Sequence, residues 1–180
     1  VTDVPFCVEM GKLGGLGVIN LEGIQTRYHN PGEALKKILT ASKEEVTGIL
    51  QQIYTEPVKE ELITRRIKEI KQSGVLAAVS SIPQKAERFA AIAQEAGADL
   101  FIVQSTVSTV RHISSQYKSL ELESFCKQMK IPVIVGNAVT HKVTLELMQC
   151  GVAGVLIGVG PGKTSVMVFA SLLSITLVPV

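Results

Sequence analysis

One local pattern occurs three times in this chain and restricts the possible folds more than any other feature. Each copy reads as the last turn of a helix, a glycine and then a short aliphatic run, in residues 12–20, 95–103 and 149–157. A glycine directly after a helix can adopt the left-handed conformation that ends it. A short, continuous aliphatic run is typical of a buried parallel strand. Repeated helix, glycine and strand therefore predict a parallel α/β architecture.

The same pattern, followed along the chain, predicts five strands with helices between them. The strands are expected at residues 17–20, 75–80, 99–104, 132–137 and 153–158. Helix starts are expected near Pro5, Pro31, Pro57, Pro83, Ser119 and Thr140. Residues 21–74 read as helix and turn, and we interpret them as an insertion after the first strand. Five parallel strands fit either an open doubly wound sheet or part of a barrel. A complete eight-stranded barrel usually needs about 250 residues, and this chain has only 180.

Composition and charge exclude several classes of protein. Hydrophobic residues make up 46% of the chain and charged residues 19%, which excludes a disordered polypeptide. Aromatic residues make up only 4%, so the core must be aliphatic. The net charge is +2, and glutamates surround the densest basic group, which is Arg65, Arg66 and Lys68. We interpret that group as a solvated helix face and expect no binding to nucleic acid.

The cysteines and the C-terminal residues bear on the compartment. Cys7, Cys126 and Cys150 are widely spaced among apolar neighbours and show neither a disulfide framework nor a metal-ligand spacing. They therefore predict a reduced, cytoplasmic location. The apolar run 166–180 is shorter than the roughly 20 residues that a membrane-spanning helix needs, so no membrane association is expected.

Polar residues follow the predicted strands at the points where the strands end. These residues are Asn20, Gln104, Ser105, Thr106 and Asn137, and a glycine-rich turn at 158–162 follows the fifth strand. In barrels and open α/β sheets alike, ligands bind at the carboxyl ends of the strands. We therefore predict a ligand site on this edge, formed by polar side chains and exposed backbone groups.

Other candidate motifs fail on spacing. Gly15 and Gly17 come before a strand, whereas a dinucleotide loop follows one. Residues 158–165 contain Gly-Lys-Thr, but a P-loop requires a glycine where Ile157 stands. The histidines are His29, His112 and His141. They have no acidic or cysteine partner at close spacing, and we interpret them as solvated side chains.

Several motifs together resemble the IMP dehydrogenase and GMP reductase superfamily. They lie at residues 1–20, 21–28, 95–104, 132–137 and 158–162. The segment 21–28 is similar to the IMP dehydrogenase-related branch that lacks the inserted CBS domain pair. The resemblance implies an α/β fold, a partial (β/α)8 TIM barrel over residues 1–162, and a homo-oligomer that is tetrameric in the family. Residues 163–180 form an apolar C-terminal segment without resemblance.

The resemblance also implies a reaction and its ligands. The family enzyme oxidises IMP to XMP with NAD and water, through a loop cysteine that attacks C2 of the purine. By this resemblance, the contacts to NAD are Gln104, Ser105, Thr106 and Asn137, and the backbone ligands of a potassium ion are Gly160 and Gly162. Asn137 is expected near the nicotinamide and its ribose.

Departures from the family pattern bear on catalysis. Ser165 occupies the place of the catalytic cysteine, and a serine hydroxyl forms far less anion at neutral pH than a thiol. Gln104 stands where many members have an aspartate. The later strands, the phosphate-binding loops and the mobile flap are not recognised after Ser165, which indicates a truncated, frame-shifted or partial product. We therefore expect an enzyme by descent that is inactive as written.

Two alternative functions remain open at this point. The chain fits a GMP reductase lineage, which would consume GMP with NADPH. It also fits a non-catalytic fragment or pseudoenzyme that acts by association, because an unclosed barrel leaves strand edges and apolar surface uncovered.

Overall fold

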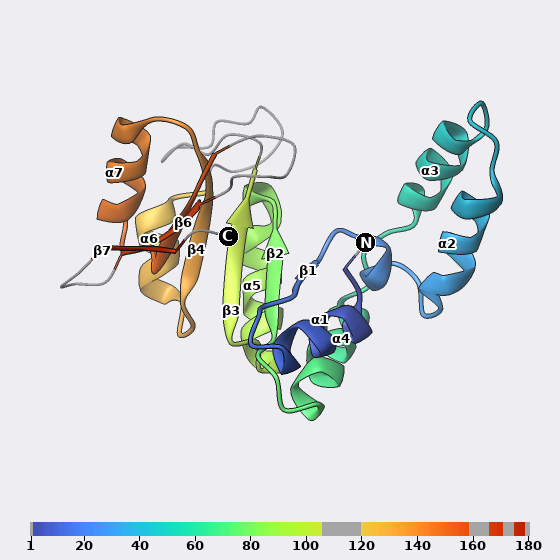
Figure 1. Ribbon diagram of the computed structural model, residues 1–180, viewed down its shortest axis with the longest axis horizontal. Coiled ribbons are helices and arrows are strands. Elements are labelled where there is room, and N and C mark those ends of the chain that lie inside the picture. The colour runs from blue at the N-terminus through green and yellow to red at the C-terminus, as the bar shows by residue number, and fades with distance from the viewer. Residues whose placement is uncertain (1, 106–119, 159–165, 171–174, 179–180) are drawn as a thin grey trace.

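The computed structural model describes residues 2–105, 120–158, 166–170 and 175–178. In these stretches the chain forms a seven-stranded sheet with helices packed against it (Figure 1). The strands are β1 (Val18–Asn20), β2 (Ala78–Ser81), β3 (Leu100–Gln104), β4 (Val133–Ala138), β5 (Gly154–Ile157), β6 (Val166–Ala170) and β7 (Ile175–Val178). The helices are α1 (Val4–Lys12), the 3-10 helix η1 (Ile24–Thr26), α2 (Pro31–Thr40), α3 (Val46–Thr55), α4 (Glu60–Gln72), α5 (Pro83–Ala96), α6 (Leu122–Gln128) and α7 (His141–Gln149).

The order of the strands decides between the two predicted architectures. From β1 to β5 the order in the sheet follows the chain, and each neighbouring pair is parallel. A doubly wound sheet reverses its order at a switch point, whereas a barrel adds each new strand to the same edge. The fold is therefore α/β and is part of a (β/α)8 barrel. The five predicted parallel strands are confirmed, although β2 begins at Ala78 instead of residue 75.

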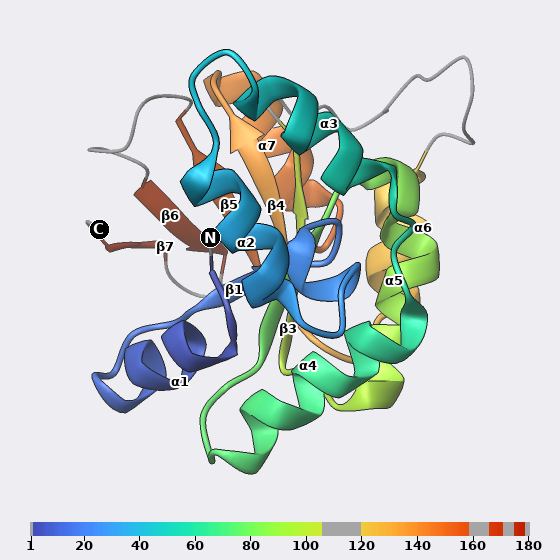
Figure 2. The same ribbon diagram turned by 90° about the vertical axis from the view of Figure 1, so that its right-hand side faces the viewer.

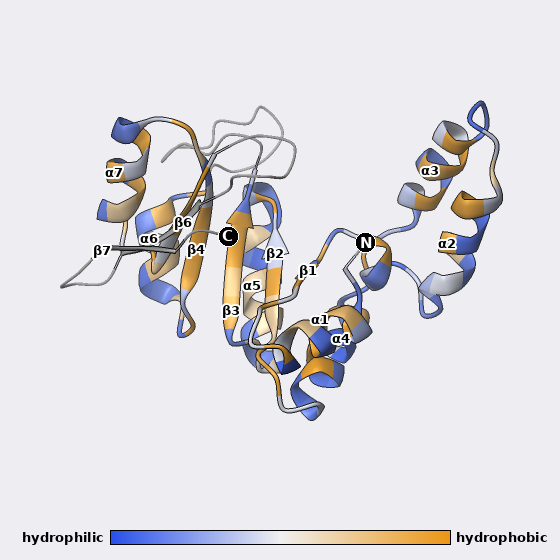
Figure 3. Cartoon of the chain, in the orientation of Figure 1, coloured by the Kyte–Doolittle hydropathy of each residue, from blue (hydrophilic) through white to orange (hydrophobic). Residues whose placement is uncertain are grey.

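The helices cover the parallel strands and enclose an aliphatic core. Helix α5 packs against β2 and β3, and α7 packs against β4 and β5. Figure 3 shows β3 and β4 as hydrophobic along most of their length. Phe101 on β3 and Phe125 on α6 meet edge to face in this core, with ring centroids 6.1 Å apart. In the part of the chain that the structure describes, every helix is too short or too polar to cross a membrane.

The glycines of the repeated pattern end the helices as predicted. Gly14, Gly97 and Gly151 all have positive φ, at 81°, 91° and 80°. Gly17 has a different role, because a Cβ there would lie 2.6 Å from the Cα of Cys7. It allows α1 to pack closely on β1.

Strands β6 and β7 extend the sheet in the antiparallel sense, which the sequence analysis does not predict. Strand β6 pairs antiparallel with β5, and β7 pairs antiparallel with β6. The connection between β5 and β6 is short and consists of residues 158–165. A parallel connection needs a crossover of about a dozen residues or more, so a link this short favours an antiparallel neighbour.

Helices α2 and α3 form a hairpin that stands apart from the sheet (Figures 1 and 2). The two helices pack on each other, and α2 also contacts η1. The hairpin shares a small apolar cluster whose buried members are Ile24, Ala34 and Ile53. Residues 21–74 are thus helical and turn-rich, as predicted. Helix α4, which follows the hairpin, begins at Glu60, after Lys59 N donates a hydrogen bond to the carbonyl oxygen of Thr26 at 2.9 Å.

The prediction of a solvated basic face on α4 is wrong for Arg66. Only 7% of Arg66 is exposed. Its Nε donates to the carbonyl oxygen of Gln25 at 3.0 Å, and its Nη2 donates to that of His29 at 3.1 Å. Its Nη1 pairs with Glu69 at 2.9 Å. The helix turns Arg66 toward the backbone of residues 25–29, so this arginine fastens the chain that leads into the hairpin.

Candidate functional site

The polar residues predicted to bind a ligand lie along the carboxyl edge of the sheet. Asn20 ends β1 and Gln104 ends β3, and both are exposed, whereas Asn137 near the end of β4 is half-buried. Because these strands are parallel and belong to one sheet, the three residues share one edge. Thr106, Gly160, Gly162 and Ser165 lie outside the described residues.

Ser105 and Asn137 are held next to each other by backbone hydrogen bonds. Ser105 N donates to the carbonyl oxygen of Gly136 at 2.8 Å, and Asn137 N donates to the carbonyl oxygen of Ser105 at 3.0 Å. These bonds continue the β3–β4 ladder beyond its last pair, Gln104 and Gly136. Two of the predicted cofactor contacts are therefore fixed side by side on the ends of rigid strands.

Asn137 occupies an irregularity in β4. Gly136 and Ala138 pair with successive residues of β5, so Asn137 has no partner on that strand, and the Gly136–Asn137 peptide bond is cis. Bulges of this kind redirect a side chain and are frequent next to active sites. The Nδ2 of Asn137 donates to the carbonyl oxygen of Gly158 at 2.7 Å. The amide is therefore oriented, and its Oδ1 has no hydrogen-bond partner among the described residues.

Gly136 is required by the close approach of β4 and β5. A Cβ at Gly136 would lie 2.4 Å from the Cβ of Leu156 and 3.0 Å from its carbonyl oxygen. A side chain here would push β5 away from β4. It would also move Gly158 away from Asn137, so the orientation of the Asn137 amide depends on this glycine.

Sequence reasoning misses Glu22, which lies at the same edge between β1 and η1. Its Oε1 accepts hydrogen bonds from Ser81 Oγ at 2.8 Å and from Ile82 N at 3.3 Å. Its backbone N donates to Asn20 Oδ1 at 2.7 Å. Its Oε2 is buried and has no partner among the described residues. Because Glu22 and Ser81 are 59 residues apart in the chain, no local pattern could have joined them.

The electrostatic environment of Glu22 is unusual for a glutamate. Burial raises the pKa of its carboxyl group, although hydrogen bonds from Ser81 and Ile82 and the charges of Lys85 and Arg27 act in the opposite direction. A carboxyl group with a perturbed pKa at a ligand edge is a candidate for a functional role.

The cysteines do not offer a nucleophile at this edge. Cys7, Cys126 and Cys150 lie on or next to helices and carry free thiols. Burial raises the pKa of Cys7 and of Cys126 to about 11, with a smaller contribution from a neighbouring charge in each case. Because the thiolate is the reactive form, raised pKa values do not favour these thiols as nucleophiles. Among the described residues, no group of three or more histidine, cysteine or acidic side chains could hold a metal ion.

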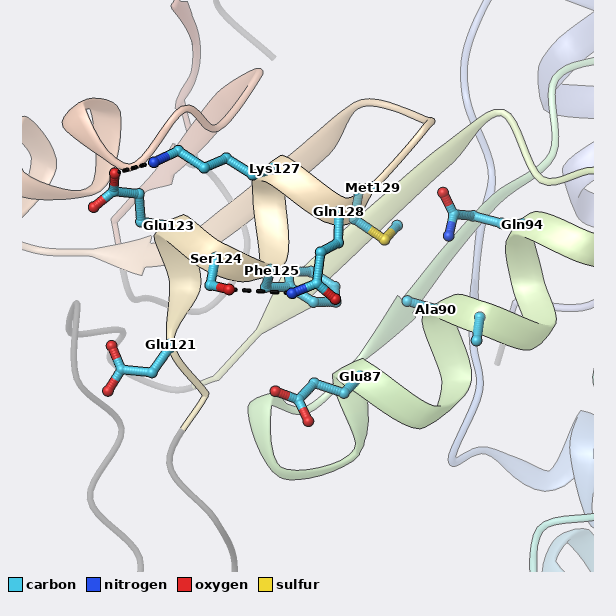
Figure 4. A pocket seen from close by; sticks show the side chains of 11 residues that line it. Glu87, Ala90, Gln94, Glu121, Glu123, Ser124, Phe125, Lys127, Gln128 and Met129 are labelled. Atoms are coloured by element: carbon cyan, nitrogen blue, oxygen red, sulfur yellow. Dashed lines mark hydrogen bonds and ion pairs between the residues drawn. The ribbon is translucent and has the colours of Figure 1, made fainter.

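A groove of about 710 Å³ between α5 and α6 is a second place where a ligand could be sought (Figure 4). It lies on the outer helical layer, away from the strand ends. Its polar groups largely satisfy one another: Lys127 pairs with Glu123 at 2.6 Å, and Gln128 Nε2 donates to Ser124 Oγ at 3.1 Å. We interpret it as a gap between neighbouring barrel helices, and the carboxyl edge remains the candidate site.

Comparison with known proteins identifies the family to which this edge belongs. A model of the IMP dehydrogenase / GMP reductase domain matches residues 1–170. The chain belongs to the IMP dehydrogenase / GMP reductase family. The resemblance inferred from the sequence motifs is therefore confirmed. The matched region extends past Ser165, which the sequence analysis predicts to stand at the place of the family cysteine.

Individual relatives agree with this assignment. An uncharacterised oxidoreductase of Mycobacterium tuberculosis is 34% identical over 160 residues, which cover 86% of this chain and 43% of that protein. The IMP dehydrogenase of Cryptosporidium parvum is 36% identical over 69 residues, 38% of this chain and 16% of that protein. The crystal structure of an IMP dehydrogenase/GMP reductase-like protein from Corynebacterium glutamicum superposes with a TM-score of 0.82 at 34% identity. It is matched over 91% of this chain and 44% of its own length, so the chain spans less than half of such family members.

Proposed function

We propose that this chain is part of an oxidoreductase that converts IMP, NAD and water to XMP and NADH. The observation that carries the proposal is the oriented amide of Asn137, fixed beside Ser105 at the carboxyl edge of a barrel of this family. A nicotinamide carboxamide presents both a donor and an acceptor. The unpartnered Oδ1 of Asn137 suits its NH2 group, because a buried donor needs an acceptor.

The other predicted contacts fit the same ligand. Gln104 offers an exposed amide next to Ser105, within reach of a ribose or carboxamide group. When bound, NAD accepts the hydride that leaves C2 of the purine.

We also propose that the backbone carbonyls of Gly160 and Gly162 bind potassium. The protein is proposed to be a cytoplasmic homo-oligomer, with neither nucleic acid nor a membrane as a partner. The odd number and wide spacing of the three cysteines, which predict no disulfide framework, support a reducing compartment.

We propose further that the chain as written does not turn over. In the family reaction a thiolate adds to C2, the C2 hydride passes to NAD, and water then releases XMP. Ser165 stands at the position of that thiol. A serine hydroxyl is a poor nucleophile without a neighbouring base.

Two measurements on the purified chain test these proposals. Isothermal titration with NAD should show binding that Asn137→Ala weakens by about two- to tenfold, the value of one hydrogen bond. Ser124→Ala in the α5–α6 groove is the matched control and should bind NAD like the wild type. Equal affinities in the wild type and Asn137→Ala would contradict the proposed site.

The second measurement is turnover. We expect no NADH above the enzyme-free background from IMP and NAD. Turnover that Ser165→Ala abolishes would contradict the proposed inactivity. NADPH-dependent loss of GMP would instead favour the reductase, which remains the alternative because the family model covers both enzymes.

A further inference from the structure

We propose that Glu22 binds the unphosphorylated ribose diol at the end of the dinucleotide remote from Asn137, and thereby selects NAD against NADP. This inference rests on the proposed function. It assigns a specificity-determining role to a residue that the sequence analysis does not single out.

The position of the Glu22 carboxylate supports the proposal. Oε1 is held by Ser81 at the end of β2 and by Ile82 N just before α5. Oε2 is buried without a donor among the described residues, and an unpaired carboxylate oxygen in such a place is unfavourable. The residue as a whole is half-buried and lies between β1 and η1, at the carboxyl ends of the strands. A ligand hydroxyl there supplies the missing donor.

The distance across the sheet is compatible with the two ends of a dinucleotide. Ser81 ends β2, Asn137 lies on β4, and β3 lies between them. Neighbouring strands are about 4.8 Å apart, so two spacings separate the two sites by roughly 10 Å. A single ribose cannot contact both. A dinucleotide has two riboses joined by a pyrophosphate, so it can place one at each site.

Among the described residues, no cation forms an ion pair with the carboxylate of Glu22. Arg27 directs its guanidinium to backbone carbonyl oxygens, including that of Glu22 at 2.9 Å and that of Tyr54 at 3.2 Å. The ammonium of Lys85 lies over the ring of Phe89, 5.9 Å from its centre. The charges of Lys85 and Arg27 act on the carboxylate without forming an ion pair with it, so it can still accept from ribose hydroxyls and it disfavours a phosphate placed next to it. Dinucleotide-binding folds of another architecture use an acidic residue on the ribose 2′-hydroxyl for the same reason.

The test measures the dissociation constants of NAD, NADP and nicotinamide mononucleotide for the 180-residue chain by titration calorimetry. We expect the wild type to bind NAD at least about tenfold more tightly than NADP, a difference of roughly 1.4 kcal/mol. Glu22→Gln, which keeps the shape and removes the charge, should lose most of that preference and leave the affinity for the mononucleotide unchanged. Glu123→Gln on α6 is the charge-matched control and should retain the wild-type preference. Thermal unfolding of each variant shows that it is folded.

The outcomes separate this inference from the proposed function. If NAD binding depends on Asn137 but the NAD-to-NADP ratio is the same in wild type and Glu22→Gln, the role of Glu22 is refuted and the proposed function stands. If NADP binds more tightly than NAD in the wild type, Lys85 or Arg27 receives the phosphate and the inference is overturned. If none of the three ligands binds, the proposed function fails together with the inference.

Discussion

The parallel sheet and the α2–α3 hairpin belong to one chain but are stabilised in different ways. The sheet buries continuous aliphatic strands under α5 and α7, and its core includes Phe101 at 0% exposure. The hairpin shares with η1 an apolar cluster that has only three buried members, and charged groups hold its base. Arg66 binds carbonyl oxygens of residues 25–29, and Arg27 binds those of Tyr54 and Glu56. The barrel part therefore depends on burial, whereas the hairpin depends on arginines that hydrogen-bond to the backbone.

This comparison matters for function because Arg27 serves both regions. Its guanidinium donates to the carbonyl oxygen of Glu22 at the ligand edge and also to carbonyls at the end of α3. The hairpin is thus attached to the same loop that carries the proposed ribose contact.

The largest expected effect distinguishes the two cores. Phe101→Ala removes a fully buried ring from the barrel core and should lower the free energy of unfolding by about 3–5 kcal/mol. Ile53→Ala in the hairpin should cost less globally, because a weakly packed unit can open by itself. Urea denaturation gives the global values, and amide hydrogen exchange should show faster exchange confined to residues 31–55 in Ile53→Ala. A uniform increase in exchange over the whole chain would contradict the separation of the two regions.

The next largest effect tests the arginine anchors. Arg66→Ala removes buried hydrogen bonds to the backbone and leaves those carbonyl oxygens unpaired, so we expect a loss of about 2–3 kcal/mol. Arg65→Ala is the matched control, since it pairs with the same Glu69 but its side chain is 55% exposed. An exposed pair of this kind contributes about 0.5 kcal/mol or less. Equal losses in the two variants, measured by urea unfolding, would show that burial of Arg66 is not what stabilises the hairpin base.

The smallest effect is a pH dependence of opposite sign at two glutamates. Burial raises the pKa of Glu22 above its ordinary value of 4.5, so its contribution to stability is present below that pH and is lost as the pH rises through the raised pKa. Burial also acts to raise the pKa of Glu69, but hydrogen bonds from Arg65 and Arg66 outweigh it and lower the pKa. The contribution of Glu69 is therefore present above 4.5 and is lost as the pH falls.

Unfolding experiments between about pH 3 and 8 on Glu22→Gln and Glu69→Gln check these signs, because glutamate titrates within this range. Relative to wild type, Glu22→Gln should gain stability as the pH rises and Glu69→Gln should lose it. Parallel pH profiles for the two variants would refute the assigned environments.

Much of the ligand edge could be read from the sequence. Asn20, Gln104 and Asn137 were predictable because each follows an aliphatic strand, and parallel strands present their carboxyl ends on one side. The orientation of Asn137 was not predictable. It depends on a bulge between Gly136 and Ala138 and on the carbonyl of Gly158, which is 21 residues away in the chain.

The sequence by itself determined the local units of this protein: where helices end at Gly14, Gly97 and Gly151, where the five parallel strands run, and which family the motifs resemble. These features depend on hydrophobic periodicity and backbone preference over a few neighbouring residues, so they can be predicted from local sequence. Only the tertiary structure decided the unreversed strand order, the burial of Arg66 and the contact of Glu22 with Ser81. Each of these depends on which distant segments pack together, and that is fixed by burial and hydrogen-bond satisfaction across the whole sheet.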